Sequence, residues 1–590
     1  MNNSGSLRDT GAFYPTGIFF LASFGYFFFI GNYVLYFQET QSLFVFSREY
    51  LHDHLLKPGG LLEYSARFMA QFYYNRFLGS VVLSLILTTP AILIYYLNKR
   101  IIAVIHFSIL LLLLPSCLMF ILQAHYYNLM EYNLGFLLVI AFYLLSVSLA
   151  GKYKPIILFV LFPLFYYLTG AFSMVFVVMY ISHSLFLGEG SRSYTYPLIM
   201  IAVATISFII SWKVIFLLQP MQQLILFPLP VLDNPLYRAV FIILSGYIVF
   251  YPLICKRVAR IKEKRFKRKS HSYGTLIVFV AVCIFLVFKI YNPQTARVVE
   301  MERLVFEEKY DEAIDFHEKK PSLNLIGQYF YNIALSETDQ LCDRLFFGRQ
   351  DFSAGALVLP WGDNHLNRGA YFYYATGLIN EAHRWAYEEM VVYGYRPQNI
   401  ELLAKTCLIS GDCDMARKYL NIMKRTIFYR KWAKEFEKMA DNPELIRSHP
   451  ELGAKFKIVP PNNFFIQFNE PQNNLPLLLE GRPENRKAIE YYLAGLLLTK
   501  KTEIAVNNVK NLKESGYTKI PRHLEEAILV YYNSTGVSPD LGGLTITPET
   551  RQRFERYFSA YRSARNNPST LKDKMEKNYG NTFWFYFHFK

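Results

Sequence analysis

Side chains suited to acid–base and anion-binding chemistry follow the first apolar run of this 590-residue sequence. Three of them are the carboxylates Glu39, Glu49 and Asp53. A carboxylate can take a proton from a reacting hydroxyl, so each is a candidate general base. The candidates for holding an anionic group are Arg67, His125, Lys213 and Arg238. Their joint chemistry depends on where the apolar segments around them place them.

Lys213 stands in an otherwise apolar run, 196–218. An ionisable group at membrane depth is costly, which makes this lysine a functional candidate. The alternative is that it lies near the outer end of the run and reaches the headgroup phosphates. For the other charged candidates the alternative is headgroup contact and salt bridges within loops.

Charge and hydropathy are distributed unevenly along the chain. The sequence is 53% hydrophobic and 17% aromatic, with a net charge of +16. Up to Tyr291 there are 22 Lys and Arg against nine Asp and Glu, whereas the remainder has 40 against 37. The positive charge therefore belongs to the apolar half, where it indicates membrane topology. A nucleic-acid binder would carry a basic stripe in its soluble part, so we predict no nucleic-acid partner.

The stretch from Lys256 to Tyr291 sets the orientation. Its basic run, 256–270, has nine Lys and Arg and the single acidic residue Glu263, and an apolar segment follows directly. Basic residues beside a span are retained on the cytoplasmic side. The next span therefore leaves the cytoplasm, and residues from about 292 onward are expected outside it.

Apolar runs of spanning length predict a polytopic bundle. They lie at 16–37, 77–97, 101–121, 134–149, 196–218, 236–254 and 273–291. The segment 155–187 is too long for one helix and is interrupted by Pro163 and by Thr169-Gly170. We interpret it as two helices meeting near Gly170, which gives about nine spans, with a re-entrant hairpin as the alternative. The N-terminus is then cytoplasmic.

The segment 38–76 predicts two amphipathic helices at the outer surface. Apolar residues recur at helical spacing on both sides of Pro58-Gly59-Gly60, which breaks the pattern. Such helices lie along a membrane surface with polar groups facing water. The polar residues that would then face the outer mouth of the bundle are Glu39, Glu49, Asp53, Glu63, Arg67 and Gln71.

The half from 292 to 590 reads as an all-α repeat domain, distinct from the membrane bundle of 1–291. Helix pairs flank Gly377 in 371–390 and Gly411-Asp412 in 399–423, with small residues where neighbouring helices meet. This spacing is typical of tetratricopeptide-like solenoids, which commonly bind protein partners. The Pro-, Asn- and Gln-rich stretch 455–480 is expected to form a long surface loop. The aromatic end FWFYFHF is expected to pack back on the repeats.

Recognisable catalytic and metal-binding motifs are absent from the sequence. The soluble half has no GxSxG, no HExxH and no phosphate-binding glycine loop. The six cysteines show no spacing typical of zinc, although a Cys407–Cys413 bridge is one option in an oxidising compartment. We therefore predict neither a metal nor another cofactor.

Three segments resemble an uncharacterised bacterial family of multi-pass membrane proteins with a tetratricopeptide-like C-terminal half. They are PGGLLEYSARFMAQFYYNRFLG (58–79), FPLFYYLTGAF (162–172) and NIALSETDQLCDRLFF (332–347). The order of parts also looks like that of GT-C glycosyltransferases, which have many spans, an outer loop with surface helices and often a soluble outer domain. Glu39 takes the place where those enzymes usually hold an Asp-containing pair.

The GT-C likeness implies a transferase that uses a polyprenyl-phosphate sugar at the bacterial inner membrane. Glu39, Glu49 or Asp53 would deprotonate the acceptor, and Arg67, His125, Lys213 or Arg238 would hold the phosphate. The C-terminal domain would be periplasmic and would bind an acceptor or a partner. The alternative is a non-catalytic scaffold that is anchored by its spans and binds protein partners through the solenoid. A transporter is less favoured, because the spans contain few charges and show no inverted repeats.

Overall fold

The computed structural model describes residues 6–590, apart from 102–108, 150–152, 189–191, 261–268, 363–364, 463, 465, 468–469 and 565–567. Every regular element in the described residues is helical. The chain divides into two compact units. The N-terminal unit is Met1–Asn292 with Arg425–Phe428, and the C-terminal unit is Pro293–Lys424 with Tyr429–Lys590. Most of the basic run 256–270 lies outside the described residues.

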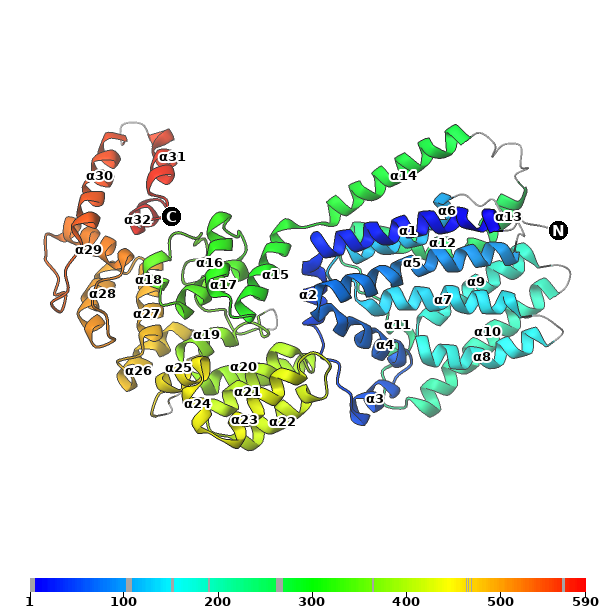
Figure 1. Ribbon diagram of the computed structural model, residues 1–590, viewed down its shortest axis with the longest axis horizontal. Coiled ribbons are helices and arrows are strands. Elements are labelled where there is room, and N and C mark those ends of the chain that lie inside the picture. The colour runs from blue at the N-terminus through cyan, green and yellow to red at the C-terminus, as the bar shows by residue number, and fades with distance from the viewer. Residues whose placement is uncertain are drawn as a thin grey trace. The chain divides into compact units, whose positions relative to one another are not determined.

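The N-terminal unit is a bundle of apolar helices. Figure 1 shows α1, α5, α7 and α9 running beside one another, and the packing of α1 on α5, α5 on α7 and α7 on α9 agrees. The elements are α1 (Ser6–Phe29), α2 (Asn32–Glu39), α3 (Arg48–Leu55), α4 (Gly60–Ala70), η1 (Gln71–Tyr74), α5 (Arg76–Ile101), α6 (Ile109–Gln123), α7 (Met130–Ser148), α8 (Lys154–Thr169), α9 (Phe172–Leu187), α10 (Arg192–Ile210), η2 (Ser211–Ile215), α11 (Met221–Leu226), α12 (Pro235–Val249), α13 (Tyr251–Arg260) and α14 (Lys269–Ile290).

The prediction of nine full spans is wrong in number. Within the described residues, three helices are long and apolar enough to cross a membrane, or up to six if each bent pair counts as one span. The three are Arg76–Ile101, Met130–Ser148 and Tyr194–Ile215. The predicted first span is a pair, α1 and α2, bent by 71°. Helices α8 and α9 have 16 residues each, about 24 Å, which is short of a hydrocarbon core about 30 Å thick.

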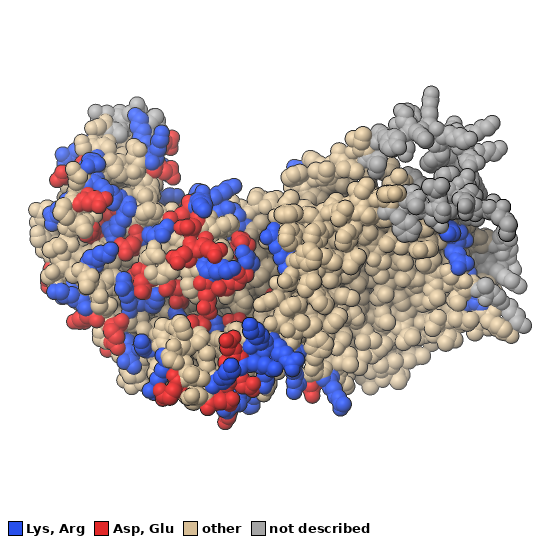
Figure 2. All heavy atoms as spheres, viewed as in Figure 1, with Lys and Arg blue, Asp and Glu red and all other residues tan. Residues whose placement is uncertain are grey.

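The surface of the N-terminal unit is apolar where its helices face outward. Leu198 and Val214 are each 66% exposed, and Phe288 is 73% exposed. Figure 2 shows a largely tan face on this unit, whereas blue and red are spread over the face of the C-terminal unit. Exposed apolar surface of this extent marks a face that contacts a membrane or another protein.

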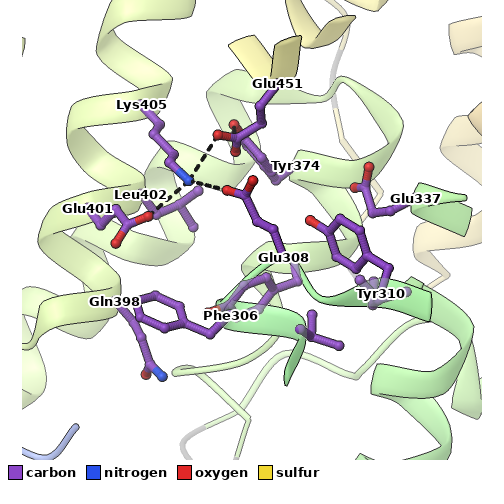
Figure 3. Close-up of a pocket in the computed structure, with 13 residues that line it drawn as sticks. Phe306, Glu308, Tyr310, Glu337, Tyr374, Gln398, Glu401, Leu402, Lys405 and Glu451 are labelled. Carbon is purple, nitrogen blue, oxygen red and sulfur yellow. Dashed lines mark hydrogen bonds and ion pairs between the residues drawn. The ribbon is translucent and has the colours of Figure 1, made fainter. Parts of the chain in front are cut away.

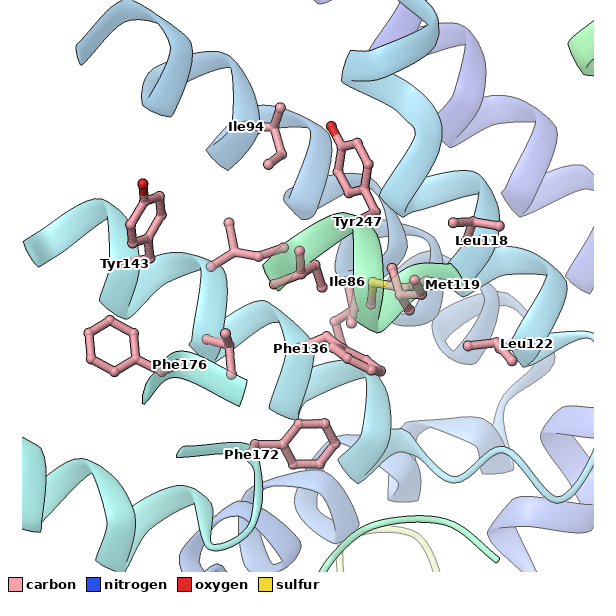
Figure 4. Close-up of a cluster of buried hydrophobic side chains, with 14 of the residues drawn as sticks. Ile86, Ile94, Leu118, Met119, Leu122, Phe136, Tyr143, Phe172, Phe176 and Tyr247 are labelled. Atoms are coloured by element: carbon pink, nitrogen blue, oxygen red, sulfur yellow. The ribbon is translucent and has the colours of Figure 1, made fainter. Parts of the chain in front are cut away.

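Aromatic and aliphatic side chains fill the centre of the bundle. Phe136 on α7 and Phe172 and Phe176 on α9 are fully buried together with Met119 on α6 (Figure 4). Gly135 allows this packing, since a Cβ there would lie 2.4 Å from the Phe172 ring. The core therefore fixes the position of α7 against α9.

Two of the predicted breaks are confirmed, and one is wrong. The loop 38–76 forms the helices α3 and α4, separated by a turn that ends at Gly59 (φ +79°). The segment 155–187 forms α8 and α9, which meet at Gly170 (φ +58°). Pro163 lies inside α8 and does not end it, because a helix inside a bundle tolerates an interior proline.

The C-terminal unit is a succession of shorter helices in which consecutive elements pack together. Helix α20 packs on α21, α21 on α22 and α22 on α23. The elements are α15 (Pro293–Phe306), α16 (Tyr310–Lys319), α17 (Leu325–Glu337), α18 (Leu341–Arg344), η4 (Ser353–Ala356), α19 (Ala370–Thr376), α20 (Ile379–Tyr393), α21 (Pro397–Ile409), α22 (Cys413–Lys424), α23 (Arg430–Asp441), α24 (Glu444–Ser448), α25 (Pro450–Ile458), η5 (Pro471–Asn473), α26 (Asn474–Gly481), α27 (Arg486–Leu498), α28 (Thr502–Asn507), η6 (Val509–Lys513), α29 (Arg522–Thr535), α30 (Pro548–Ala564), α31 (Pro568–Tyr579) and α32 (Phe583–Phe589).

Most local predictions for this unit are confirmed. The helix pairs turn at Gly377 (φ +87°) and Gly411 (φ +80°), and the aromatic end forms α32 with Trp584 fully buried. The predicted loop 455–480 is wrong at both ends, because α25 runs to Ile458 and α26 begins at Asn474. Buried Leu475 and Leu478 give α26 an apolar face that the polar composition of the stretch obscures. All six cysteines are free thiols, Cys407 and Cys413 included.

Candidate functional sites

Helix α4 carries a buried carboxylate clamped by two cations. Glu63 Oε2 lies 2.6 Å from Lys57 Nζ, and Glu63 Oε1 lies 2.5 Å from Arg67. The His54 ring lies 4.0 Å from the same carboxylate, and Arg67 also donates a hydrogen bond to the Tyr50 hydroxyl at 3.4 Å. We call these five residues the Glu63 cluster. It includes Arg67, one of the residues predicted to hold a phosphate.

Opposing effects set the charge state of this cluster. Burial by itself raises the pKa of Glu63, but the charges of Arg67 and Lys57 outweigh burial and hold that pKa below its ordinary value. Burial also lowers the pKa of His54, so the imidazole stays neutral at neutral pH. The cluster then carries two positive charges against the one negative charge of Glu63. Glu131, in the first turn of α7, lies close enough to Arg67 to add an electrostatic interaction.

Two tight backbone crossings position the cluster. Gly59 N–H donates to the Tyr167 carbonyl on α8 at 2.8 Å, and Ala171 N–H donates to the Phe227 carbonyl at 2.9 Å. Gly170 lies between them, where a Cβ would be 2.4 Å from the Phe227 oxygen. Lys57 Nζ lies over the Phe227 ring at 4.1 Å. The glycines therefore allow the loop before α4, the α8–α9 turn and the loop before α12 to meet.

A second polar group lies beside α2. Gln123 Nε2 donates to Gln38 at 3.2 Å, Asn128 Nδ2 donates to Gln123 at 2.9 Å, and the Tyr237 hydroxyl donates to Asn128 at 2.5 Å. Each amide has a partner, so this network holds α2, α6 and α12 together. His125 lies beside it, stacked on Tyr126 at 5.2 Å between ring centroids. Burial lowers the pKa of His125, which makes it a weak partner for a phosphate at neutral pH.

The predicted carboxylates differ sharply in exposure. Glu39 ends α2 and is only 6% exposed, and α2 packs against α4 and η1. Glu49 and Asp53 lie on α3, and both are exposed. An exposed carboxylate keeps its hydration and is a poorer base than one shielded from water. Glu39 is therefore the best placed of the three.

The remaining predicted cations lie apart from α4. Lys213 is exposed in the π-helical turn η2, with Nζ 3.7 Å from the Trp212 ring centroid. Arg238 is exposed at the start of α12 and donates to the Leu232 carbonyl at 2.6 and 3.0 Å. The structure thus brings Arg67 together with Lys57 and Glu63, but it does not gather the predicted phosphate ligands into one site.

The C-terminal unit contains a cluster that the sequence did not reveal. Lys405 Nζ lies 3.0 Å from Glu308, 2.9 Å from Glu401 and 3.0 Å from Glu451 (Figure 3). The Tyr374 hydroxyl donates to Glu451 at 2.6 Å. A cavity of about 40 Å³ lies against these side chains, room for a few water molecules. We call this cluster the Lys405 pocket.

Lys405 is held charged inside the unit. Burial would lower its pKa, but the surrounding glutamates outweigh burial and raise that pKa well above its ordinary value. Burial raises the pKa of Glu401 and that of Glu308. Since three carboxylates occupy the three ammonium protons, Lys405 cannot act as a nucleophile. The pocket instead ties the turn after α15 to α21 and α25.

Only one part of the Lys405 pocket has a local sequence signal. Glu401 and Lys405 are four residues apart, a spacing that places both on one helix face. Glu308 reaches Lys405 from the turn after α15, and Glu451 reaches it from α25. Among the described residues, no group of three or more His, Cys, Asp and Glu side chains is arranged to hold a metal ion.

These features define an all-helical protein with several apolar helices able to cross a membrane and a second helical unit rich in charge. The chain belongs to a family of unknown function, DUF6057, whose model matches residues 10–590. The predicted membership of an uncharacterised family spanning nearly the whole chain is therefore confirmed. Neither the curated proteins nor the solved structures include a match.

Proposed function

We propose that this protein is a GT-C-like membrane transferase that takes a sugar from a lipid-phosphate carrier, and that the Glu63 cluster recognises the phosphate. The observation that supports it is the pair of cations, Lys57 and Arg67, on one ordered loop beside apolar helices. A loop at the edge of a membrane bundle is where a lipid phosphate lies. The pair supplies the charge that such a group needs.

Arg67 and Lys57 have enough hydrogen-bond donors to bind a phosphate. A guanidinium has five N–H donors, and Arg67 directs donors to Glu63 and the Tyr50 hydroxyl. A lysine ammonium has three protons, and Lys57 contacts one carboxylate oxygen. Both groups can therefore bind a phosphate while Glu63 keeps them in place. Glu63 itself, neutralised by two cations, is a poor general base.

Glu39 is the proposed general base. It takes the proton of the acceptor hydroxyl as the acceptor oxygen bonds to the anomeric carbon of the sugar. The bond from that carbon to the phosphate oxygen breaks, and the phosphate leaves with the electron pair. Lys57 and Arg67 neutralise the charge that develops there. Helix α2, which ends at Glu39, contacts α4, which carries Arg67, and Lys57 lies in the turn before α4.

The proposed setting is the bacterial inner membrane, with a cytoplasmic N-terminus and a periplasmic, tetratricopeptide-like C-terminal domain. Partly exposed Cys413 gives a direct test of this orientation. A membrane-impermeant thiol reagent should label it in spheroplasts, whose outer surface is accessible. Labelling only after the membrane is opened would reverse the orientation.

The activity is tested with the full chain in liposomes that contain a polyprenyl-phosphate sugar. Transfer to an added acceptor should fall roughly 100- to 10,000-fold in Glu39→Gln, the range for loss of a general base. Glu49→Gln is the matched control, because that exposed carboxylate lies on the neighbouring loop helix, and it should retain full activity. Equal activity in both variants would remove Glu39 from the mechanism.

An exposed apolar patch on the C-terminal unit favours the scaffold as a second candidate. Tyr387 and Val391 on α20 and the following Tyr395 are 46%, 62% and 41% exposed. Aromatic side chains of this kind anchor protein partners. In this alternative, Val391→Glu abolishes recovery of a partner, while Glu39→Gln does not affect that recovery. A transferase would instead lose sugar transfer in Glu39→Gln and keep it in Val391→Glu.

A further inference from the structure

A long apolar groove lies between α1, α6 and α14. Its volume is about 710 Å³, and its described lining contains no charged side chain. Helix α14 packs against α6 and diverges from α1 toward its own N-terminal end (Figure 1). The groove is therefore open to the side, between helices whose outward residues are apolar.

The dimensions of the groove fit a hydrocarbon chain. Its lining on α1 runs from Tyr14 to Tyr26, which is about 18 Å of helix at 1.5 Å per residue. One leaflet contributes about half of a hydrocarbon core about 30 Å thick, so a whole chain of one leaflet can lie in the groove. A polar ligand would find no charged partner in this lining, whereas an apolar chain in the groove makes dispersion contacts along it.

One end of the groove carries the polar groups that distinguish a lipid head from its tail. Tyr26 lines the groove, and its hydroxyl is buried without a hydrogen-bond partner among the described residues. Tyr291, at the end of α14, lines the same region. A buried hydroxyl normally has a partner, and an ester or phosphate oxygen would supply one. The lining around Ile18 and Val280 is apolar, and Tyr14, one turn before Ile18, carries a hydroxyl at the opposite end.

We propose that this groove binds one hydrocarbon chain of a membrane lipid, with the polar head at the Tyr26–Tyr291 end and the tail toward Val280. The site lies on different helices from the Glu63 cluster and does not depend on the proposed transferase. The bound lipid fills the space between α14 and the helices beside it, and thereby holds α14 in place.

The first test uses the full chain in vesicles of phosphatidylethanolamine and phosphatidylglycerol whose acyl chains end in a diazirine. After photolysis, label is expected on peptides that contain Ile18 or Val280. Label on peptides around Tyr26 and Tyr291 instead would overturn the orientation. Labelling no stronger than at Val160, which is 71% exposed on α8 outside the groove, would overturn the site itself.

The second test counts lipid molecules retained by the purified full chain, by native mass spectrometry. Ala22→Trp fills the groove and should reduce retention at least tenfold, whereas Val160→Trp should leave it unchanged. Tyr26→Phe removes only the hydroxyl and should weaken retention about three- to tenfold, the worth of one hydrogen bond. Wild-type retention in both groove variants would refute the proposal, and it would do so whether or not the protein transfers a sugar.

Discussion

Replacement of Lys405 by Met should destabilise the C-terminal unit severely. Lys405 is 7% exposed and lies about 3 Å from three carboxylates, at 3.0, 2.9 and 3.0 Å. Methionine fills a similar volume but leaves those carboxylates together without a countercharge. Removing one partner from a buried ion pair costs about 3–5 kcal/mol, a large share of a typical stability of about 5–15 kcal/mol.

The pH dependence of this loss follows from the remaining glutamates. Without the ammonium, burial and mutual repulsion raise the pKa values of Glu308, Glu401 and Glu451 above those of the unfolded chain. For an acid whose pKa is raised on folding, stability is complete at low pH and is lost as pH rises through the folded pKa. The variant should therefore be closest to wild type near pH 5 and worst near pH 8.

Thermal unfolding of the full chain in detergent, with hydrogen exchange of α21 peptides, measures the effect. Exposed Lys418→Met on α22 is the matched control and should change stability by less than about 0.5 kcal/mol. Adding Glu401→Gln to Lys405→Met should recover part of the loss. A loss below about 1 kcal/mol that does not vary with pH would refute the reasoning.

Two further predictions concern buried groups outside this pocket. Burial raises the pKa of Glu490 to about 7. The stability that the protonated Glu490 carboxyl contributes is therefore fully present below about pH 4 and is lost as pH rises through 7. Glu490→Gln should then be more stable than wild type at pH 8 by up to about 3 kcal/mol. Exposed Glu503→Gln is the control and should not gain stability. Equal melting temperatures for Glu490→Gln and wild type at pH 8 would contradict the prediction. Gly170→Ala should cost at least about 1–2 kcal/mol, because φ is +58° and a Cβ would meet the Phe227 oxygen, while Gly246→Ala, with open space around it, should be tolerated or stabilising. Equal melting temperatures for the two alanine variants would show that the crossing at Gly170 is not tight.

Local features were predictable from the sequence because they depend on neighbouring residues. Gly59, Gly170, Gly377 and Gly411 mark turns that need a positive φ, and each turn occurs where the pattern placed it. Periodicity likewise revealed α3 and α4. Pro163 misled, because the effect of a proline depends on the surrounding helices as well as on the helix that contains it.

Features that depend on contacts between distant residues, or on the angle between successive helices, were not predictable from the sequence. Hydropathy reports that 16–37 is apolar but not that the chain bends by 71° between α1 and α2. Glu308 and Lys405 are 97 residues apart, and only the fold shows that they form an ion pair. Arg67 was identified as a candidate, whereas its partner Lys57 was missed because the turn that directs Lys57 toward Glu63 depends on Gly170 and Phe227.

The most direct test of the proposed function is a high-resolution map of the full chain extracted gently with its own lipids. The proposal predicts a lipid phosphate within hydrogen-bond distance of both Lys57 and Arg67, with a sugar on the side toward Glu39. Lys57 and Arg67 in contact with Glu63 alone, and no phosphate beside α4, would contradict it.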